Sequence, residues 1–317
     1  MSGLSNIFRW RDATPVEVRP VGPGEIEPAL RLILGSYGGR ADSATAAEFE
    51  GFAQEREIDL TTIFVAAAGP KLVAATLPIA SPGHTALLMT STAGASQVAA
   101  QHLARCIDAS TNDLMSPRHS IRIVQILLEA SEHRLERELR ALGFVDVATL
   151  IYLQRTVSRP SPAPVFAQGV SLVTYSPQTH DLFSRAILAS YEQSLDCPTL
   201  HNRRGIEDVI TGHRATGEYD PELWFCVMEA GEPRGVLLLA GVSGHDALEL
   251  VYLGLAPAAR GRRLGDALLQ LALFEIGNRR LSQLTLAVDA LNIPAIRLYH
   301  RHGLAEVHRR LALMKMA

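Results

Sequence analysis

The sequence predicts an α/β protein in which one structural unit occurs twice in tandem. Strand-like and helix-like segments alternate along the whole chain instead of forming separate blocks. Alternate prolines at Pro160, Pro162 and Pro164 predict an extended, semi-rigid spacer near the middle. The ends of the two halves line up, because Leu142-Gly143-Phe144 matches His302-Gly303-Leu304 at a shift of 160 (303 − 143). That match indicates an internal duplication.

The N-terminal half opens with an alternating run at 16–20, which Pro20 closes as a strand. Two helices are expected next, at 25–34 and 43–57, the second with Ser43 as its N-cap. Apolar periodicity and Gly or Pro punctuation predict the remaining elements: strands at 62–68, 71–79, 85–91, 121–129 and 147–155, and helices at 96–107 and 133–142.

The C-terminal half repeats this order. It is expected to contain strands at 169–175, 248–255 and 284–288, a hairpin across Gly231-Glu232-Pro233, and helices at 180–190, 204–211, from Asp266 and from Ile293. Pro294 fits the first turn of the last helix and Gly303 its end. The predicted segments are a tail at 1–15, a first domain at 16–157, a Pro-rich linker at 158–168 and a second domain at 169–317.

Composition excludes several function classes. Of 317 residues, 47% are hydrophobic and 20% charged, as in soluble globular proteins. The net charge of −3 gives no reason to expect nucleic acid, and no apolar run approaches a membrane span or a signal-peptide core. Cys106, Cys197 and Cys226 have neither disulfide nor metal spacing. We expect a cytoplasmic protein without a metal.

The stretch from Leu248 to Leu304 carries the chemistry. A strand is followed by Arg260-Gly261-Arg262-Arg263-Leu264-Gly265 and then by a helix. A turn that enters a helix presents unpaired N–H groups at the positive end of the helix dipole, which favours phosphate. The two glycines allow close approach and the three arginines add charge. The sequence therefore predicts a pyrophosphate site; the alternative is an ordinary connection with solvated arginines.

A second motif follows, and together the two resemble the GNAT acyltransferase superfamily. Its pattern is a strand, [Q/R]-x-x-G-x-[G/A], a helix, a strand, and N-x-x-A-x-x-[L/x]-Y-x-x-x-G-[F/L]. The first part fits at Arg260 and Gly265 but has Arg263 where a glycine is usual, which leaves one glycine fewer. The second part fits at Asn292, Ala295, Leu298, Tyr299, Gly303 and Leu304.

The resemblance implies tandem acyl-CoA N-acyltransferase (GNAT) domains, each a mixed, mostly antiparallel sheet flanked by helices. It also implies acetyl-CoA as co-substrate, held where two central strands diverge, here at Gly254, with backbone groups left free for the pantetheine arm and the oxyanion. The cofactor-binding residues would be Leu253, Leu255, Arg260, Gly261, Arg262, Arg263, Leu264, Gly265, Asp266 and Asn292.

Acetyl transfer to an amine needs a proton acceptor, an oxyanion donor and an acid for the thiolate. Glu249 stands eleven positions before Arg260 (260 − 249), where some members of the superfamily place their base. The resemblance makes Tyr299 the general acid. The alternatives are a solvated cleft residue for Glu249, a core residue for Tyr299, and a helix N-cap or turn residue for Asn292.

The acceptor loop is expected at 190–201. Glu192 and Asp196 suit a cationic amine, and Tyr191 suits an apolar wall. Cys197 is rejected as a nucleophile because no histidine base is positioned for it.

The N-terminal copy looks degenerate. Glu132 stands where the other copy has Asn292, and Leu139 where it has Tyr299; the turn at 92–99 lacks the arginines and the spaced glycines. Its expected role is scaffold and cleft wall, with a retained ligand site as the alternative. This tandem arrangement is similar to that of the mycothiol synthase family in architecture alone.

Two functions are compatible with these features. The first is an acetyl-CoA-dependent N-acetyltransferase acting on a primary amine of a small molecule or peptide. The second is a non-catalytic acyl-CoA-binding or sensing protein. Neither nucleic acid nor membrane is expected as a partner, and the oligomeric state is open.

Overall fold

A computed structural model describes residues 15–38, 42–158, 161–200 and 203–317. Apart from residue 15, the predicted N-terminal tail lies outside the described residues, as do residues 159 and 160 of the predicted linker. The helices are α1 (Ile26–Leu34), α2 (Ser43–Glu55), α3 (Gln97–Leu114), α4 (His133–Ala141), α5 (His180–Tyr191), α6 (Ile206–Arg214), α7 (Leu264–Asn278) and α8 (Ile293–Arg301). The strands are β1 (Val16–Pro20), β2 (Phe64–Ala68), β3 (Lys71–Ser81), β4 (Thr85–Thr90), β5 (Ile123–Glu129), β6 (Val145–Thr156), β7 (Val170–Thr174), β8 (Glu218–Glu229), β9 (Glu232–Gly241), β10 (Ala247–Leu255), β11 (Gln283–Asp289) and β12 (Ala305–Met316).

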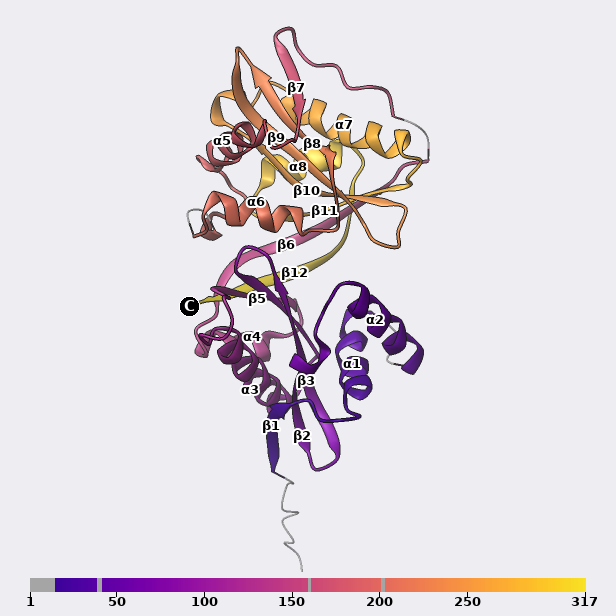
Figure 1. The fold of residues 1–317 in the computed structure, drawn as a ribbon, viewed down its shortest axis with the longest axis vertical. Helices are drawn as coiled ribbons and strands as arrows, with labels where there is room; N and C mark the ends of the chain where they lie inside the picture. The colour runs from indigo at the N-terminus through magenta and orange to yellow at the C-terminus, as the bar shows by residue number, and fades with distance from the viewer. Residues whose placement is uncertain (1–14, 39–41, 159–160, 201–202) are drawn as a thin grey trace, which may run out of the picture.

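The strands form one 12-stranded sheet in the order β1-β2-β3-β4-β5-β12-β6-β11-β10-β9-β8-β7, with helices on both faces (Figure 1). Among the described strands, β4–β5 and β10–β11 are the parallel pairs, and the other neighbours are antiparallel. The predicted mixed, mostly antiparallel sheet is confirmed.

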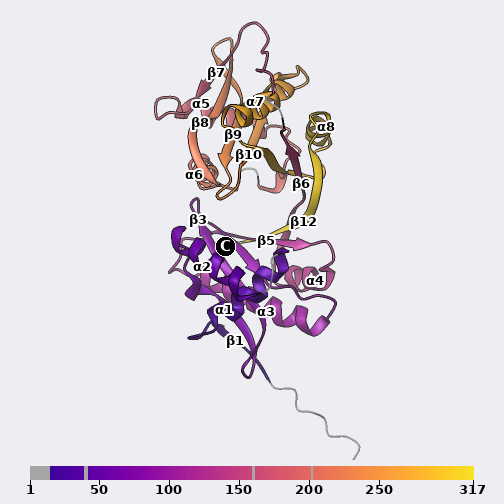
Figure 2. The ribbon, with the colours of Figure 1, turned by 90° about the vertical axis from the view of Figure 1, so that its right-hand side faces the viewer.

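The two halves exchange their last strands. The strand β6 follows α4 in the N-terminal half but pairs with β11 of the C-terminal half, while β12 follows α8 and pairs with β5. These two strands also pair with each other and run between the halves (Figure 2). The division into domains at 158–168 stays a prediction, and the exchange makes the sheet continuous across it.

The repeat expected from the sequence recurs in three consecutive elements. The starts of β5 and β11 differ by 160 positions (283 − 123), and α4 and α8 (293 − 133) and β6 and β12 (305 − 145) keep that spacing. Gly143 and Gly303 follow the two helices with φ of 89° and 76°, the left-handed backbone that favours glycine after a helix.

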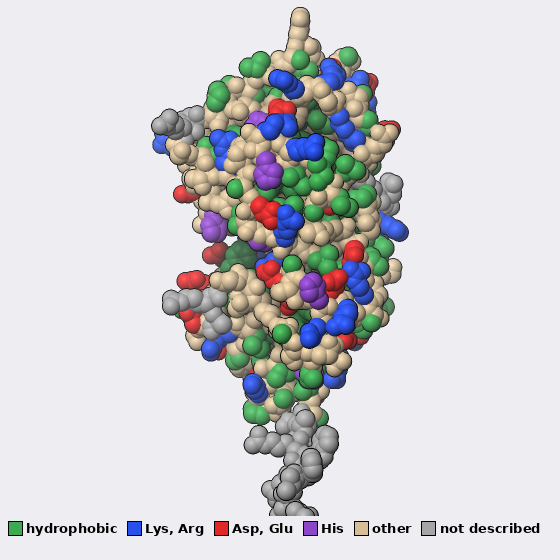
Figure 3. All heavy atoms as spheres, turned by 180° about the vertical axis from the view of Figure 1, so that it is seen from behind, with side chains coloured by type: hydrophobic (Ala, Val, Ile, Leu, Met, Phe, Trp, Pro, Cys, Tyr) green, Lys and Arg blue, Asp and Glu red, His purple; other side chains and the backbone are tan. Residues whose placement is uncertain are grey.

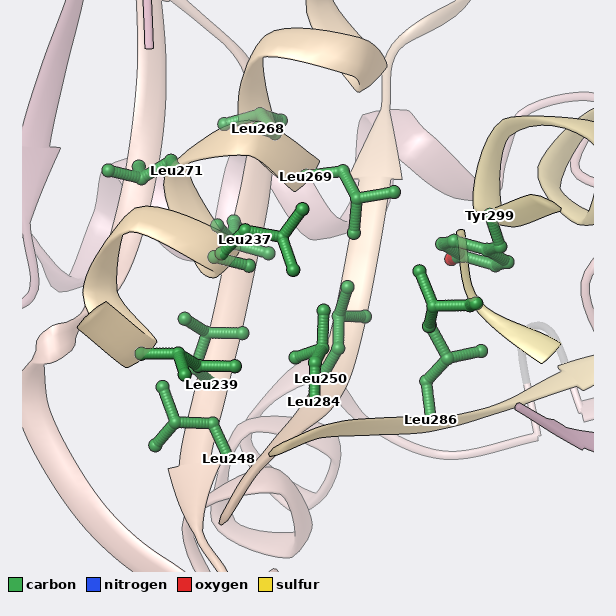
Figure 4. Packing of buried hydrophobic residues seen from close by; sticks show 14 of the residues in the cluster. Leu237, Leu239, Leu248, Leu250, Leu268, Leu269, Leu271, Leu284, Leu286 and Tyr299 are labelled. Atoms are coloured by element: carbon green, nitrogen blue, oxygen red, sulfur yellow. The ribbon is translucent and has the colours of Figure 1, made fainter. Parts of the chain in front are cut away.

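Each half has a core on each face of the sheet. In the C-terminal half the larger core lies between the sheet and α7, whose Leu268, Leu269 and Ala272 are fully buried. Figure 4 shows these leucines facing Leu237, Leu250 and Leu284 of the strands. Burying one such side chain contributes about 1.5–3 kcal/mol, so this helix is fixed firmly on the sheet.

The start of α2 differs from the expectation. Ser43 is the first helical residue and Asp42 is the N-cap, whose Oδ1 accepts a hydrogen bond from Thr45 N at 3.0 Å. The physical reason is backbone geometry, since Asp42 has the extended φ and ψ (−117° and 167°) that an N-cap requires.

Acidic and basic side chains are interspersed on the face shown in Figure 3. None of the helices in the described ranges combines the length and the apolar character that crossing a membrane requires.

Candidate functional site

The strands β10 and β11 diverge at the centre of the C-terminal half. They pair only from Ala247↔Gln283 to Glu249↔Thr285, although β10 continues to Leu255 and β11 to Asp289. A bulge against β9 between Leu250 and Tyr252 bends β10 just after this point. The sequence placed the divergence at Gly254, but it begins at Glu249.

The turn into α7 leaves its backbone donors free. Within the described part of the chain, no hydrogen bond engages the N–H groups from Gly261 to Asp266, and Ala267 is the first to donate, to Arg263 O at 3.1 Å. Gly261 has φ of 72° and Arg263 has φ of 61°. The arginine thus adopts the left-handed backbone that a glycine would take more easily. We call these donors the amide cradle (residues 261–266).

The cradle borders a groove of ≈790 Å³ between α7, α8 and the end of β10. It is lined by every predicted cofactor-binding residue except Arg262, namely Leu253, Leu255, Arg260, Gly261, Arg263, Leu264, Gly265, Asp266 and Asn292. Arg262 instead forms an ion pair with Glu229, with Nη1 2.8 Å from Oε2. The Arg263 side chain is exposed and makes no hydrogen bond or ion pair with another described residue.

Arg260 fixes the loop after α5 onto the end of β10. Its guanidinium donates to four backbone oxygens, those of Leu255 (3.0 Å), Gln193 (3.1 Å), Ser190 (2.9 Å) and Glu192 (2.7 Å). This charge was predicted to face phosphate, whereas the guanidinium donates to backbone carbonyl oxygens. Arg260 therefore has a structural role, holding the end of α5 and the loop after it against the end of β10.

Asp266 joins the two helices that flank the groove. Its carboxylate accepts hydrogen bonds from Arg301 Nη2 (3.1 Å) and His302 Nε2 (3.2 Å) on and after α8. Burial opposes ionisation, but these hydrogen bonds outweigh it and the pKa of Asp266 is lowered. Arg301 lines the groove. It was not predicted because it stands at an unspecified position of the second motif, between Tyr299 and Gly303.

A smaller pocket of ≈180 Å³ adjoins the groove through Leu253, Leu255 and Asn292, and Asp196 lies in its wall. Asn292 caps α8, since its Oδ1 accepts from Ala295 N at 3.3 Å. Asn292 is therefore both the N-cap of α8 and a wall residue of the two pockets.

Asp289, which directly follows the strand predicted at 284–288, fixes the acceptor loop. It is 1% exposed. Its Oδ2 accepts from Cys197 N (3.1 Å) and its Oδ1 from Leu291 N (2.9 Å), while its own N–H donates to Asp196 Oδ1 (3.4 Å). The signal in the sequence was an acidic residue directly after an apolar strand, a position where a carboxylate needs hydrogen-bond donors if it is buried.

Tyr191, Glu192 and Cys197 of the predicted acceptor loop do not line the smaller pocket. Burial raises the pKa of Tyr191 to about 12, and its ring stands edge-on to Tyr252 with centroids 6.3 Å apart. Glu192 is exposed and lines neither the groove nor the smaller pocket. Burial also raises the pKa of the Cys197 thiol, which does not favour a nucleophilic thiolate.

Tyr299 lies in the core with 6% of its surface exposed, and Figure 4 shows its ring beside Leu286. Burial raises the pKa of its phenol, and the Asp196 carboxylate raises it further. The phenol thus stays protonated near the acceptor loop, although the residue lines neither pocket.

Glu249 faces a third space, a cavity of ≈680 Å³ between the halves. The cavity is lined from the N-terminal half by α2 residues such as Phe52 and by Ile79 and His119, and from the C-terminal half by Val242 and Glu249. Burial raises the pKa of Glu249. The structure therefore does not bring Glu249 and Tyr299 into one pocket.

The corresponding turn of the N-terminal half has its own side chains as partners. Ser96 Oγ accepts from Ala99 N (3.2 Å), and Glu132 Oε1 accepts from Ala93 N (3.3 Å). These contacts replace the free donors seen at 261–266. In the ranges that the structure describes, no group of three or more His, Cys, Asp or Glu residues is arranged to hold a metal.

Comparisons with known proteins find similarity to acetyltransferases. Residues 189–304 match the Acetyltransferase (GNAT) family. The chain is 34% identical over 176 residues to a mycothiol acetyltransferase of Acidothermus cellulolyticus, covering 52% of this chain and 53% of that one. It is 26% identical over 220 residues to the enzyme of that name from Jonesia denitrificans, covering 65% and 67%. The chain thus spans about half the length of the first of these relatives.

Two solved structures share the fold over nearly the whole chain. One is a GCN5-related N-acetyltransferase from Sphaerobacter thermophilus, with a TM-score of 0.63, 20% identity and coverage of 95% of both chains. The other is a tandem GNAT protein from the clavulanic acid biosynthesis pathway, with a TM-score of 0.54, 16% identity and coverage of 95% and 98%.

Proposed function

We propose that this chain, whose residues 189–304 match the Acetyltransferase (GNAT) family, transfers an acetyl group from acetyl-CoA to a primary amine of a small molecule or peptide. The observation that carries the proposal is the amide cradle, a run of unpaired N–H groups at the start of α7 beside a ≈790 Å³ groove. Free donors at the positive end of a helix dipole suit a pyrophosphate.

The rest of the co-substrate would extend along the groove. The pantetheine arm would follow the free edge of β10 at Leu253 and Leu255, where the strand has left β11. Asn292 lines both the groove and the adjoining pocket, so its side-chain amide is placed beside the arm. Arg263 would add charge at the phosphate end.

The reaction would proceed by direct attack. The amine nitrogen forms a bond to the thioester carbonyl carbon, the carbon–sulfur bond breaks, and the amine proton passes to a base while the thiolate takes up a proton. An amine of pKa about 10.4 arrives mostly as ammonium, so a base is needed. Glu249 is the proposed base, because it faces the cavity and burial raises its pKa toward neutrality. Tyr299 is the proposed acid.

A non-catalytic acyl-CoA-binding protein is the second candidate. It is favoured by one observation, that Tyr299 is 6% exposed and shares no pocket with Glu249. The two functions differ in whether CoA is released when an amine is added.

Calorimetric titration of acetyl-CoA into the full chain tests the proposal. Arg263→Glu places a negative charge at the cradle and should weaken binding, whereas Arg137→Glu, the same change on the exposed face of α4, should not. One site lost in the first variant supports the assignment, and absence of binding in the unmodified protein would overturn it. A panel of amines with detection of released CoA then separates the enzyme from the sensor.

A further inference from the structure

We infer that the exchanged strands build part of the acceptor site: Tyr152 of β6 and His308 of β12 form an aromatic platform beside Glu249 that holds a small cationic amine. The inference rests on the proposed function for its meaning, but the binding itself can be measured without turnover. Neither residue belongs to a recognised motif of the chain.

Glu249 and its polar neighbours lie on the face of the sheet opposite α7. Leu248 and Leu250 point into the core under α7, so Glu249 between them points to the opposite face. Thr285 pairs with Glu249, and Gln154 pairs with Thr285. Paired residues share a face, so a row of polar side chains crosses β10, β11 and β6 on the cavity side.

Tyr152 lies on the same face, two residues from Gln154. It pairs in register with His308 of β12, and the two rings stack with centroids 4.2 Å apart at 17°. On the β10 side of this pair lies Ala287, which pairs with Tyr152 and is exposed. Its small side chain covers little of the Tyr152 ring on the side toward Glu249, whose own neighbour on β11 is Thr285.

The charges around the platform favour a cation. β6 and β10 are separated by one strand, hence about 10 Å. Burial raises the pKa of the Tyr152 phenol, the Arg310 guanidinium lowers it, and the Glu249 carboxylate raises it by a smaller amount. On the other side Arg310 is already paired with Glu129 at 2.8 Å and covers the ring of Tyr37. The Glu129 carboxylate therefore offsets part of the Arg310 charge, and Glu249 supplies negative charge on the β10 side of the platform.

Aromatic faces next to a carboxylate are a recognised arrangement for ammonium groups. An amine substrate arrives as ammonium, so the platform would hold it where Glu249 can take its proton. Because β6 and β12 come from different halves, neither half would bind the acceptor alone.

The test uses choline as the probe and its neutral analogue 3,3-dimethylbutan-1-ol as the control, with binding to the full chain followed by NMR. We expect choline to bind and the alcohol not to bind. Tyr152→Leu should weaken choline binding about 5–30-fold, the range for a desolvated cation–π contact, and Tyr152→Phe should stay near the unmodified value. His308→Ala changes an exposed side chain and should weaken choline binding without affecting folding. His133→Ala, on the exposed start of α4, is the matched control.

Equal choline binding by the unmodified protein, Tyr152→Leu and His308→Ala would overturn the inference, as would equal binding of the alcohol. Acetyl-CoA titration of the same variants should give an unchanged affinity. If choline binds as expected but no amine releases CoA, the proposed function fails while the platform stands.

Discussion

Replacing Arg260 with alanine should destabilise the protein before any ligand is added. Two of its four hydrogen bonds, to Leu255 O and Ser190 O, are partly buried. A hydrogen bond from a charged donor contributes about 1.5 kcal/mol at the low end, so losing these two costs about 3 kcal/mol. With an unfolding entropy of about 2.1 cal/mol/K per residue over 317 residues, the melting temperature should fall by about 4 °C.

The assay is thermal unfolding followed by circular dichroism, with urea titration as a second measure. Arg260→Lys should recover less than half of the loss, because an ammonium cannot replace the planar fork. Arg262→Ala is the control, since that side chain makes an exposed pair with Glu229 and should leave the melting temperature unchanged. Melting of Arg260→Ala within 1 °C of the unmodified protein, or an equal fall in Arg262→Ala, would refute the role assigned to Arg260.

Three further outcomes are expected. Burial raises the pKa of Glu249 above 4.5, so the native state binds this proton more tightly than the unfolded chain and ionisation costs stability as pH rises. Glu249→Gln should therefore leave the free energy of unfolding unchanged or raise it at pH 7, and this gain should disappear below pH 4.5. The same variant should abolish the fall in acetyl-transfer rate at acidic pH. An unchanged fall would remove Glu249 from the mechanism. Asp289→Asn keeps one acceptor oxygen, leaves one of the Cys197 and Leu291 N–H groups unsatisfied, and should cost about 1–3 kcal/mol in urea unfolding; a smaller loss would mean that the loop re-forms without it. Gly254→Ala would place its Cβ 2.5 Å from Ser190 Oγ and 2.6 Å from Tyr252 Cε1, and this overpacking should cost about 1–3 kcal/mol, whereas unchanged stability would show that α5 can move away.

Features governed by local sequence were predictable. Gly303 after α8 has the left-handed backbone expected of it, and Asn292 caps the same helix. The 160-residue repeat was visible because both copies preserve the order and spacing of their last three elements. The cradle also followed from local chemistry, even with Arg263 at the position where glycine is usual.

Features governed by distant contacts were not predictable. Three of the four acceptors of the Arg260 guanidinium lie at the end of α5 and in the loop after it, for example Ser190 O, 70 positions away (260 − 190). No periodicity in the sequence predicts that contact. The same holds for Asp289, whose partner Cys197 comes from another element. Strand exchange could not be predicted from the sequence, because β6 and β12 are both 12 residues long and both follow a short helix. No local feature determines whether each strand pairs within its own half or with the other half.

The exchange has a consequence for how the chain is made. Synthesis proceeds from the N-terminus, and domains usually fold as units in that order. Here β5 ends at Glu129 and its neighbour β12 begins at Ala305, 176 positions later (305 − 129). During translation β5 therefore has an unpaired edge until β12 has left the ribosome, and such an edge is open to pairing with a neighbouring nascent chain. Co-translational chaperones that cover strand edges should matter more for this protein than for one whose halves close independently.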